Sequence, residues 1–214
     1  MHPRYSVRRA TAFSLVELTA AIAIIALLAV IIMPAMRGIM AKADETRCAS
    51  NLRQIGLAMG TYAAEHDNRL PGPLYTRQGS YYGTRDSYAL PMLLAPYLGL
   101  PTNVSFEKAK LFECPAWRKM VKGDGGKVYA IQTAALCTDG TQKQPFGYPA
   151  TSQYAEKPVV PLVALASLSK TPALWDLDAL NGGPSDGTVP AKPAHGQRRN
   201  TLFFDWHVES VPVP

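Results

Sequence analysis

The run of apolar residues near the N-terminus constrains this chain more than any other feature. From Phe13 to Met36 the sequence has one charged side chain, Glu17. As a helix rising about 1.5 Å per residue, this segment is long enough to cross the ~30 Å hydrocarbon core of a membrane. Leu, Ile, Ala and Val occupy all of its faces, whereas a soluble amphipathic helix would keep a polar stripe. The segment therefore predicts a transmembrane helix over 13–36.

Charged residues beside the apolar run predict its orientation. Arg4, Arg8 and Arg9 precede it without acidic neighbours, which places the N-terminus on the cytoplasmic side. These arginines supply three of the six net positive charges of the chain, so the charge does not indicate a nucleic-acid-binding protein. We therefore expect a single-pass protein of the inner membrane, with the remaining chain periplasmic or extracellular and no nucleic-acid partner.

Three interpretations fit an apolar segment in this position. A plain membrane anchor is the simplest. A secretory signal peptide is the second, because Ala41-Lys42-Ala43 resembles a cleavage site, but the run exceeds the usual h-region of about 7–15 residues. The third depends on Glu17, because a carboxylate inside an apolar helix costs roughly 2.5–3.5 kcal/mol and needs a partner. A cut before Phe13 would create an α-amino group four residues away that could be this partner.

The motif AFSLVEL over residues 12–18 resembles the prepilin cleavage and methylation motif of type IV pilins and type II secretion pseudopilins. The basic leader matches as well, and Pro34 is the 22nd residue counted from Phe13. The family usually has Gly where this chain has Ala12. The resemblance implies that a prepilin peptidase removes the leader 1–12 and methylates Phe13. It also implies assembly with other pilin-like subunits through Glu17 and Pro34.

Beyond Pro34 the sequence becomes amphipathic and predicts a helical continuation over 37–68, with a kink or local unwinding at the proline. We expect Leu52, Ile55 and Met59 to pack on the head, with Cys48 buried on the same stripe. The apolar positions recur every three or four residues: Met36, Met40, Ala43, Cys48, Leu52, Ile55, Met59 and Tyr62. Asn68, Pro71 and Gly72 should end the helix. The segment RCASNLRQIG over 47–56 resembles pilin-like proteins that carry an H-X9-DG element near the C-terminus.

Residues 69–214 predict a loop-rich α+β head domain outside the cytoplasm, with a small antiparallel sheet. Strand candidates are 127–132, 173–175, 201–204 and 207–211, and 86–98 is a helix candidate with Ser87 near its cap. The resemblance implies a pilin-like fold, with a long N-terminal helix packed on the sheet of the head.

His195 and Asp205 match the H-X9-D part of the family element, and Asn200 to Val208 fits its hairpin. The usual Gly after the Asp is Trp206, which predicts a different or longer turn and an exposed ring that offers a contact point. His195, Asp205 and His207 together would suit zinc chemically. Hydrogen-bonded imidazoles are the simpler interpretation, and we expect no metal there.

Asp176, Asp178 and Asp186 offer the oxygen ligands of a calcium loop, but the EF-hand spacing fails at Leu180. A strand end followed by a turn explains them more simply. The sequence contains no nucleophile elbow, phosphate loop or metalloprotease motif. We therefore expect neither an enzyme nor a bound cofactor.

Three cysteines allow one disulfide with one thiol left over. Loop closure alone does not choose between Cys48–Cys114 and Cys114–Cys137, and three reduced thiols are also compatible with the sequence. The resemblance to pilin-like proteins favours Cys48–Cys114, because similar proteins carry cysteines in both of these contexts.

The expected function is that of a prepilin-type structural subunit, assembled through its N-terminal helix into a pilus or secretion pseudopilus. The alternative is an uncleaved, single-pass periplasmic binding module whose head is the functional part.

Overall fold

A computed structural model of the chain describes residues 14–123, 126–184 and 186–213. The predicted leader 1–12 and the predicted cleavage site between Ala12 and Phe13 lie outside these residues. The chain divides after Met40 into two compact units.

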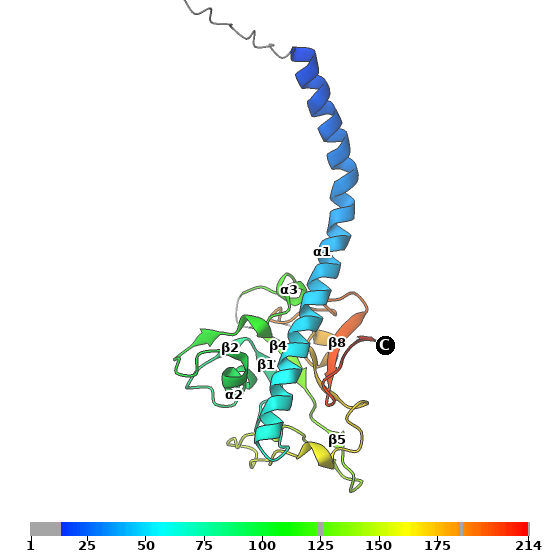
Figure 1. Ribbon diagram of the computed structural model, residues 1–214. Coiled ribbons are helices and arrows are strands. Elements are labelled where there is room, and N and C mark those ends of the chain that lie inside the picture. The colour runs from blue at the N-terminus through cyan, green and yellow to red at the C-terminus, as the bar shows by residue number, and fades with distance from the viewer. Residues whose placement is uncertain (1–13, 124–125, 185, 214) are drawn as a thin grey trace, which may run out of the picture. The chain divides into compact units, whose positions relative to one another are not determined.

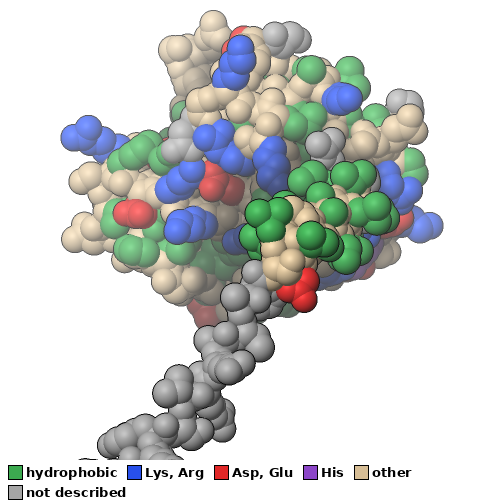
Figure 2. All heavy atoms as spheres, turned by 90° about the horizontal axis from the view of Figure 1, so that it is seen from above, with side chains coloured by type: hydrophobic (Ala, Val, Ile, Leu, Met, Phe, Trp, Pro, Cys, Tyr) green, Lys and Arg blue, Asp and Glu red, His purple; other side chains and the backbone are tan. Residues whose placement is uncertain are grey.

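The first unit consists of the N-terminal part of helix α1 (Leu15–Glu65; Figure 1). Its segment Leu15–Met33 has a mean hydropathy of 2.8, and none of it is buried in the structure. Apolar side chains surround this end of the helix in the view along its axis (Figure 2). In the part of the chain that the structure describes, this is the one helix whose length and composition would allow it to cross a membrane. The helical backbone continues through Pro34, so the expected local unwinding is not found there.

The second unit begins at Ala41 and includes the C-terminal part of α1. Cys48, Leu52, Ile55 and Met59 are fully buried, which confirms the predicted packed face. Ala43, on the same apolar stripe, is exposed, so the packed face of this unit begins at Cys48.

Helix α1 ends close to the predicted position. Asp67 and Asn68 adopt left-handed backbone conformations, with φ of 52° and 59°. The carbonyl of Ala63 in the last turn accepts both the His66 N–H at 3.2 Å and the Asn68 N–H at 2.8 Å, which closes the helix end. Asparagine tolerates this conformation better than most residues, and the chain then enters the head.

The head is built on one antiparallel sheet, with strand order β1-β4-β7-β8-β9. These strands are β1 (Arg77–Gly79), β4 (Lys127–Ile131), β7 (Pro172–Asp176), β8 (Arg198–Phe203) and β9 (Val208–Pro212). The four strand candidates therefore form β4, β7, β8 and β9. The C-terminal part of α1 crosses one face of this sheet (Figure 1), which gives the predicted α+β class.

Shorter elements complete the head. Two two-stranded sheets pair β2 (Tyr81–Tyr82) with β3 (Glu107–Lys108) and β5 (Ala135–Leu136) with β6 (Gln142–Lys143). The short α-helices are α2 (Leu90–Leu93) and α3 (Pro115–Arg118), and the 3-10 turns are η1 (Ala95–Leu98), η2 (Lys110–Phe112), η3 (Leu162–Ala164) and η4 (Ala179–Asn181).

The predicted helix over 86–98 is wrong in its extent. The chain forms only α2 and η1 in this region, and α2 begins after Ala89 rather than near Ser87. Pro91 occupies the first turn of α2, where a proline is tolerated because that N–H has no partner within a helix.

The β8–β9 hairpin has the longer turn that Trp206 predicted. The Trp206 N–H donates to the Phe203 carbonyl, and the Phe203 N–H donates to the His207 carbonyl, both at 3.0 Å. The loop therefore has three residues, the last of which takes a positive φ of 70°. The expectation of an exposed Trp206 ring was wrong: the ring is half-buried and packs against Gly60 of α1.

Candidate functional site

Glu17, the residue expected to mediate assembly, has a local hydrogen-bond partner at the start of α1. Its Oε2 accepts the Ser14 N–H at 2.9 Å, while Ser14 Oγ accepts the Val16 N–H at 3.3 Å. These reciprocal contacts resemble a capping box, and the Ser-x-x-Glu pattern is its sequence signal. The Ser14 N–H remains present after a cut before Phe13, so the cap is compatible with processing.

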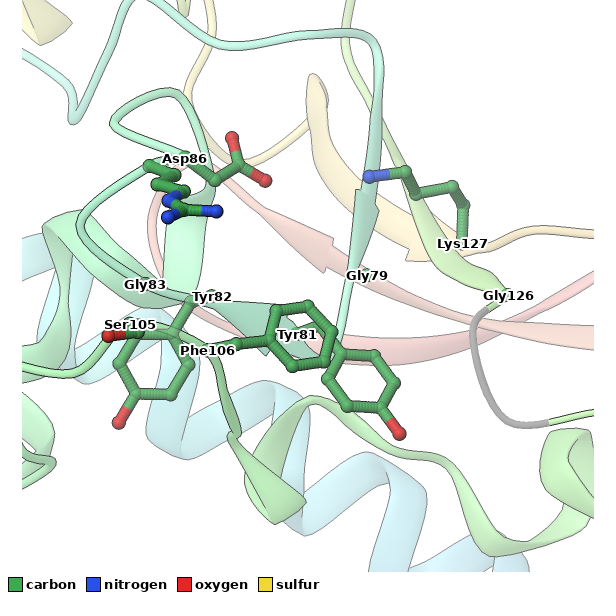
Figure 3. A pocket seen from close by; sticks show the side chains of 10 residues that line it. Gly79, Tyr81, Tyr82, Gly83, Asp86, Ser105, Phe106, Gly126 and Lys127 are labelled. Carbon is green, nitrogen blue, oxygen red and sulfur yellow. The ribbon is translucent and has the colours of Figure 1, made fainter.

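The head carries a pocket of about 750 Å³ that the sequence did not predict. Its wall includes the stacked rings of Tyr81 and Phe106, whose centroids lie 4.6 Å apart, and the charged side chains of Arg85, Asp86 and Lys127 (Figure 3). Phe106 is 70% exposed. No sequence signal could have found this pocket, because its residues come from three separate loops and strand ends.

A disulfide joins Cys48 of α1 to Cys114, the residue before α3. This is the pairing that the family resemblance favoured, and Cys137 is a buried free thiol. The two cysteines are 66 residues apart, and a loop of that length corresponds to about 4 kcal/mol in the chain-entropy model. One turn further along α1, Asn51 Nδ2 donates to the Glu113 carbonyl at 2.8 Å. The helix is therefore fastened to the 113–114 segment twice.

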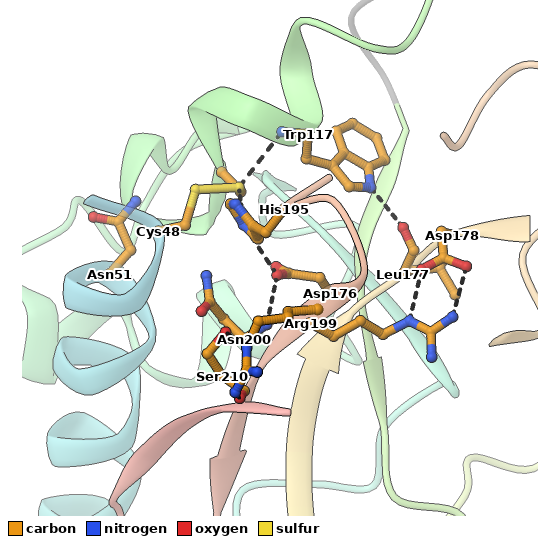
Figure 4. Close-up of polar contacts among 12 residues, drawn as sticks. Cys48, Asn51, Trp117, Asp176, Leu177, Asp178, His195, Arg199, Asn200 and Ser210 are labelled. Carbon is orange, nitrogen blue, oxygen red and sulfur yellow. Dashed lines mark hydrogen bonds and ion pairs between the residues drawn. A yellow bond between two sulfur atoms is a disulfide. The ribbon is translucent and has the colours of Figure 1, made fainter. Parts of the chain in front are cut away.

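His195 lies against this disulfide (Figure 4). Its Nε2 is 3.3 Å from Cys114 Sγ and also 3.3 Å from Asp176 Oδ2. The side chains of His195 and Asp176 are each only 2% exposed. A disulfide sulfur and a carboxylate both act as acceptors, so we assign a proton to Nε2 that is shared between them.

This arrangement differs from a catalytic Cys–His–Asp triad. A triad holds the nucleophile and the carboxylate on different ring nitrogens, whereas His195 contacts both partners through Nε2. The Cys114 sulfur is also bonded to Cys48 and has no thiolate to offer. In the oxidised state the cluster is therefore a structural contact between α1, the 113–114 segment and the sheet.

Asp176 connects the cluster to the central strands. Its Oδ2 also accepts the Asn200 N–H at 3.1 Å, while Oδ1 has no hydrogen-bond partner in the described part of the chain. The buried hydroxyl of Tyr129, which pairs with Asp176 across β4 and β7, also has no partner there. Burial, and secondarily the charge of Asp176, raise the pKa of Tyr129 well above its usual value. Tyr129 is therefore neutral near pH 7.

The structure separates the residues of the predicted H-X9-D element. His195 belongs to the cluster just described, and Asn200 lies beside it in β8. Asp205 and His207 instead bind each other at the hairpin, where the His207 ring stacks on Phe203 at 4.4 Å. Burial raises the pKa of Asp205, but hydrogen bonds from His207 outweigh it and lower the pKa below its usual value.

The three carboxylates considered for calcium each have their own protein partner. Asp178 receives two hydrogen bonds from Arg199, at 2.7 and 2.9 Å, and caps η4. Asp186 binds Thr188, and Asp176 contacts His195. Among the described residues, the group with metal-ligating geometry is Cys48, Cys114 and His195, whose ligand atoms lie within 4.8 Å of one another.

Basic residues of the 108–127 region pair with acidic ones. Lys108 binds Glu113 at 2.7 Å, and Lys119 pairs with Asp44 of α1. These two pairs neutralise part of the positive charge of this region.

Comparisons with protein-family models, with curated proteins and with solved structures found no match to this chain.

Proposed function

We propose that this chain is a prepilin-type subunit that is cleaved after Ala12 and assembled through its N-terminal helix into a pilus or secretion pseudopilus. The observation that carries the proposal is the unburied apolar helix Leu15–Met33, whose one charged residue is Glu17 and which follows a basic leader. A prepilin peptidase of the inner membrane would cut the chain and methylate Phe13. The protein is then a substrate and a building block rather than an enzyme.

Assembly follows from the energetics of Glu17 in the membrane. When subunits associate, their apolar helices leave lipid and pack together, and each Glu17 carboxylate can neutralise the Phe13 ammonium of a neighbour. Two paired charges in a dry helix bundle are less costly than two isolated ones. The capping contact with Ser14 uses one carboxylate oxygen and leaves Oε1 for such a partner.

Variants of Glu17 separate its capping role from its charge. Glu17→Gln keeps an oxygen that can accept the Ser14 N–H but removes the charge, whereas Glu17→Ala removes both. We expect both variants to insert into the membrane, and both to be depleted in sheared and pelleted surface fibres by about tenfold or more, which corresponds to a loss of at least about 1.4 kcal/mol.

Two outcomes for these variants would contradict the proposed role of the Glu17 charge in assembly. Normal incorporation of Glu17→Gln together with poor incorporation of Glu17→Ala would assign Glu17 to helix capping alone. Normal incorporation of both would exclude any role for this residue in assembly. Membrane extraction of each variant controls for expression and insertion.

The pocket in the head supports a second candidate function, an uncleaved membrane-anchored periplasmic binding module. Its volume of about 750 Å³ falls within the range of about 300–1,000 Å³ that is typical of small-molecule sites. The stacked, partly exposed Tyr81 and Phe106 rings would provide the contact surface. This alternative predicts that the Met1 N-terminus is retained and that Glu17→Gln has no phenotype.

A further inference from the structure

The Cys48–Cys114 disulfide lies beside two further metal-ligating side chains, which come from distant parts of the chain. Cys48 is on α1, Cys114 precedes α3, Asp176 ends β7, and His195 lies in the loop before β8. We propose that reduction of the disulfide converts this cluster into a binding site for one Zn²⁺, with Cys48, Cys114, His195 and Asp176 as its four ligands. The proposal does not depend on cleavage or assembly of the chain.

The chemistry of the four side chains matches zinc. Structural zinc sites are closed, four-coordinate and built from thiolate, imidazole and carboxylate ligands. Calcium and magnesium prefer oxygen ligands alone, so two sulfur atoms argue against them. Both cysteines are fully buried, and the side chains of His195 and Asp176 are each 2% exposed, as a closed site requires.

The spacing of the ligand atoms also fits. With Zn–N of about 2.0–2.1 Å and Zn–S of about 2.3 Å, tetrahedral angles place a nitrogen and a sulfur about 3.5 Å apart, and a nitrogen and an oxygen about 3.4 Å apart. His195 Nε2 lies 3.3 Å from Cys114 Sγ and 3.3 Å from Asp176 Oδ2. The ligand atoms of Cys48, Cys114 and His195 lie within 4.8 Å of one another, and breaking the disulfide bond lets the two sulfur atoms separate. Asp176, which contacts His195, must move toward the sulfur atoms to complete the tetrahedron.

Asp176 offers the fourth ligand from the end of β7. Its Oδ2 lies 3.3 Å from His195 Nε2 and also accepts the Asn200 N–H at 3.1 Å, so this oxygen faces the site. The other oxygen, Oδ1, is buried without a hydrogen-bond partner among the described residues, and zinc bound through Oδ2 leaves it in that environment.

The change of state balances as follows. A dithiol supplies the two electrons and two protons and becomes a disulfide, or a phosphine supplies the two electrons and becomes a phosphine oxide while water supplies the oxygen and the two protons; in both cases the protein disulfide becomes two thiols. Zn²⁺ binding releases both thiol protons, and His195 binds through Nε2 with its ring proton on Nδ1. In either state the cluster fastens α1 to the 113–114 segment, so zinc can hold the head together before the disulfide has formed.

The test uses the full chain in detergent micelles. The protein is reduced with a water-soluble phosphine under nitrogen and titrated with Zn²⁺ in competition with a chromogenic chelator. We expect one Zn²⁺ per reduced chain, release of two protons, and no binding by the oxidised protein. With Co²⁺ as the probe, the reduced protein should show thiolate-to-cobalt charge-transfer absorption. Absence of stoichiometric Zn²⁺ binding by the reduced wild-type chain overturns the proposal without recourse to any variant.

Variants assign the ligands. Cys137→Ala is the matched control, because it removes the free cysteine and should bind Zn²⁺ like the wild type. Cys48→Ser combined with Cys114→Ser should abolish binding, and Asp176→Asn should weaken it, because a neutral amide replaces a carboxylate ligand. Circular dichroism of each reduced variant checks that the head is folded. Wild-type affinity in the double serine variant, or loss of binding in Cys137→Ala, contradicts the assignment.

Discussion

Trp206 shows how one residue can be strained in its backbone and still be favourable in its packing. Its φ of 70° lies in the left-handed region, which costs most residues roughly 1–2 kcal/mol. The ring is half-buried against α1, where a Cβ on Gly60 would lie only 2.9 Å from Trp206 Nε1. Gly60 therefore permits the ring contact, and burial of the ring offsets the strain of the turn.

Two substitutions at Trp206 separate these effects. Trp206→Ala loses the ring and keeps the strained backbone, whereas Trp206→Gly loses the ring and relieves the strain. We expect both to destabilise the head, with Trp206→Gly the more stable of the two by about 1 kcal/mol. Urea unfolding of both proteins in the same detergent measures the difference. Equal stabilities, or a more stable Ala variant, would contradict the assignment of strain to this position.

At the scale of elements, the contact between α1 and the central sheet depends on Gly56. A Cβ at this position would lie 2.7 Å from Leu202 Cδ1 of β8, closer than side chains tolerate. Ala is the better helix former by about 1 kcal/mol, so replacing an exposed helical glycine by Ala would normally stabilise the protein. The close approach explains why a glycine suits this position of a long helix.

We expect Gly56→Ala to destabilise the head by about 1–3 kcal/mol despite its higher helix propensity, because the added methyl group overpacks the interface. Leu202→Ala removes the atom that the methyl group would meet. In that background the same substitution should be neutral or stabilising. A double-mutant cycle by urea unfolding measures the coupling. Simple additivity of the two substitutions would show that their contact is not the cause.

The elements were more predictable than the contacts between them. The spacing of apolar residues predicted the second half of α1 and its buried residues from Cys48 onward. Runs of β-branched and aromatic residues predicted β4, β7, β8 and β9. The 86–98 region failed because Pro91 and local turns break a helical pattern into two short pieces. Periodicity reports which face of an element is apolar, and it does not report where a short element stops.

The candidate sites were less predictable, for a physical reason. Glu17 and Ser14 are neighbours in the chain, and the pattern Ser-x-x-Glu is a sequence signal for their capping contact, although the contact was not predicted. His195 was paired in the prediction with Asp205 and His207, which are close in sequence, whereas the fold brings it to Cys114 and Asp176. Contacts across a sheet depend on strand order, which the sequence pattern does not specify.

At the scale of the whole molecule, several surface carboxylates stabilise the folded head through partners that favour their charged form. The pKa values of four are below their usual range: Glu45 beside Lys42, Asp139 beside Lys143, Asp186 beside Thr188 and Asp205 beside His207. A carboxyl group whose pKa is lower in the folded state stabilises that state above its unfolded pKa of about 4, and this contribution disappears as the pH falls through the folded value.

We therefore expect the urea midpoint of the head to be nearly constant between pH 7 and about pH 5 and to fall below about pH 4. Asp139→Asn should reduce the acid-induced part of the change, because it removes one of these carboxyl groups. Measurement of the midpoint across this range provides the check. A midpoint that rises on acidification would contradict the stated sign.

Assembly of the whole molecule depends on how its N-terminus is processed, because only a cut before Phe13 creates the amine that can pair with Glu17. The most direct measurement is N-terminal sequencing, together with the intact mass, of the full-length protein extracted from membranes. The account predicts a chain that starts at Phe13 and carries one added methyl group on its amine. A start at Met1 would show a plain anchor, a start at Asp44 would show a signal peptide, and either result would contradict the account.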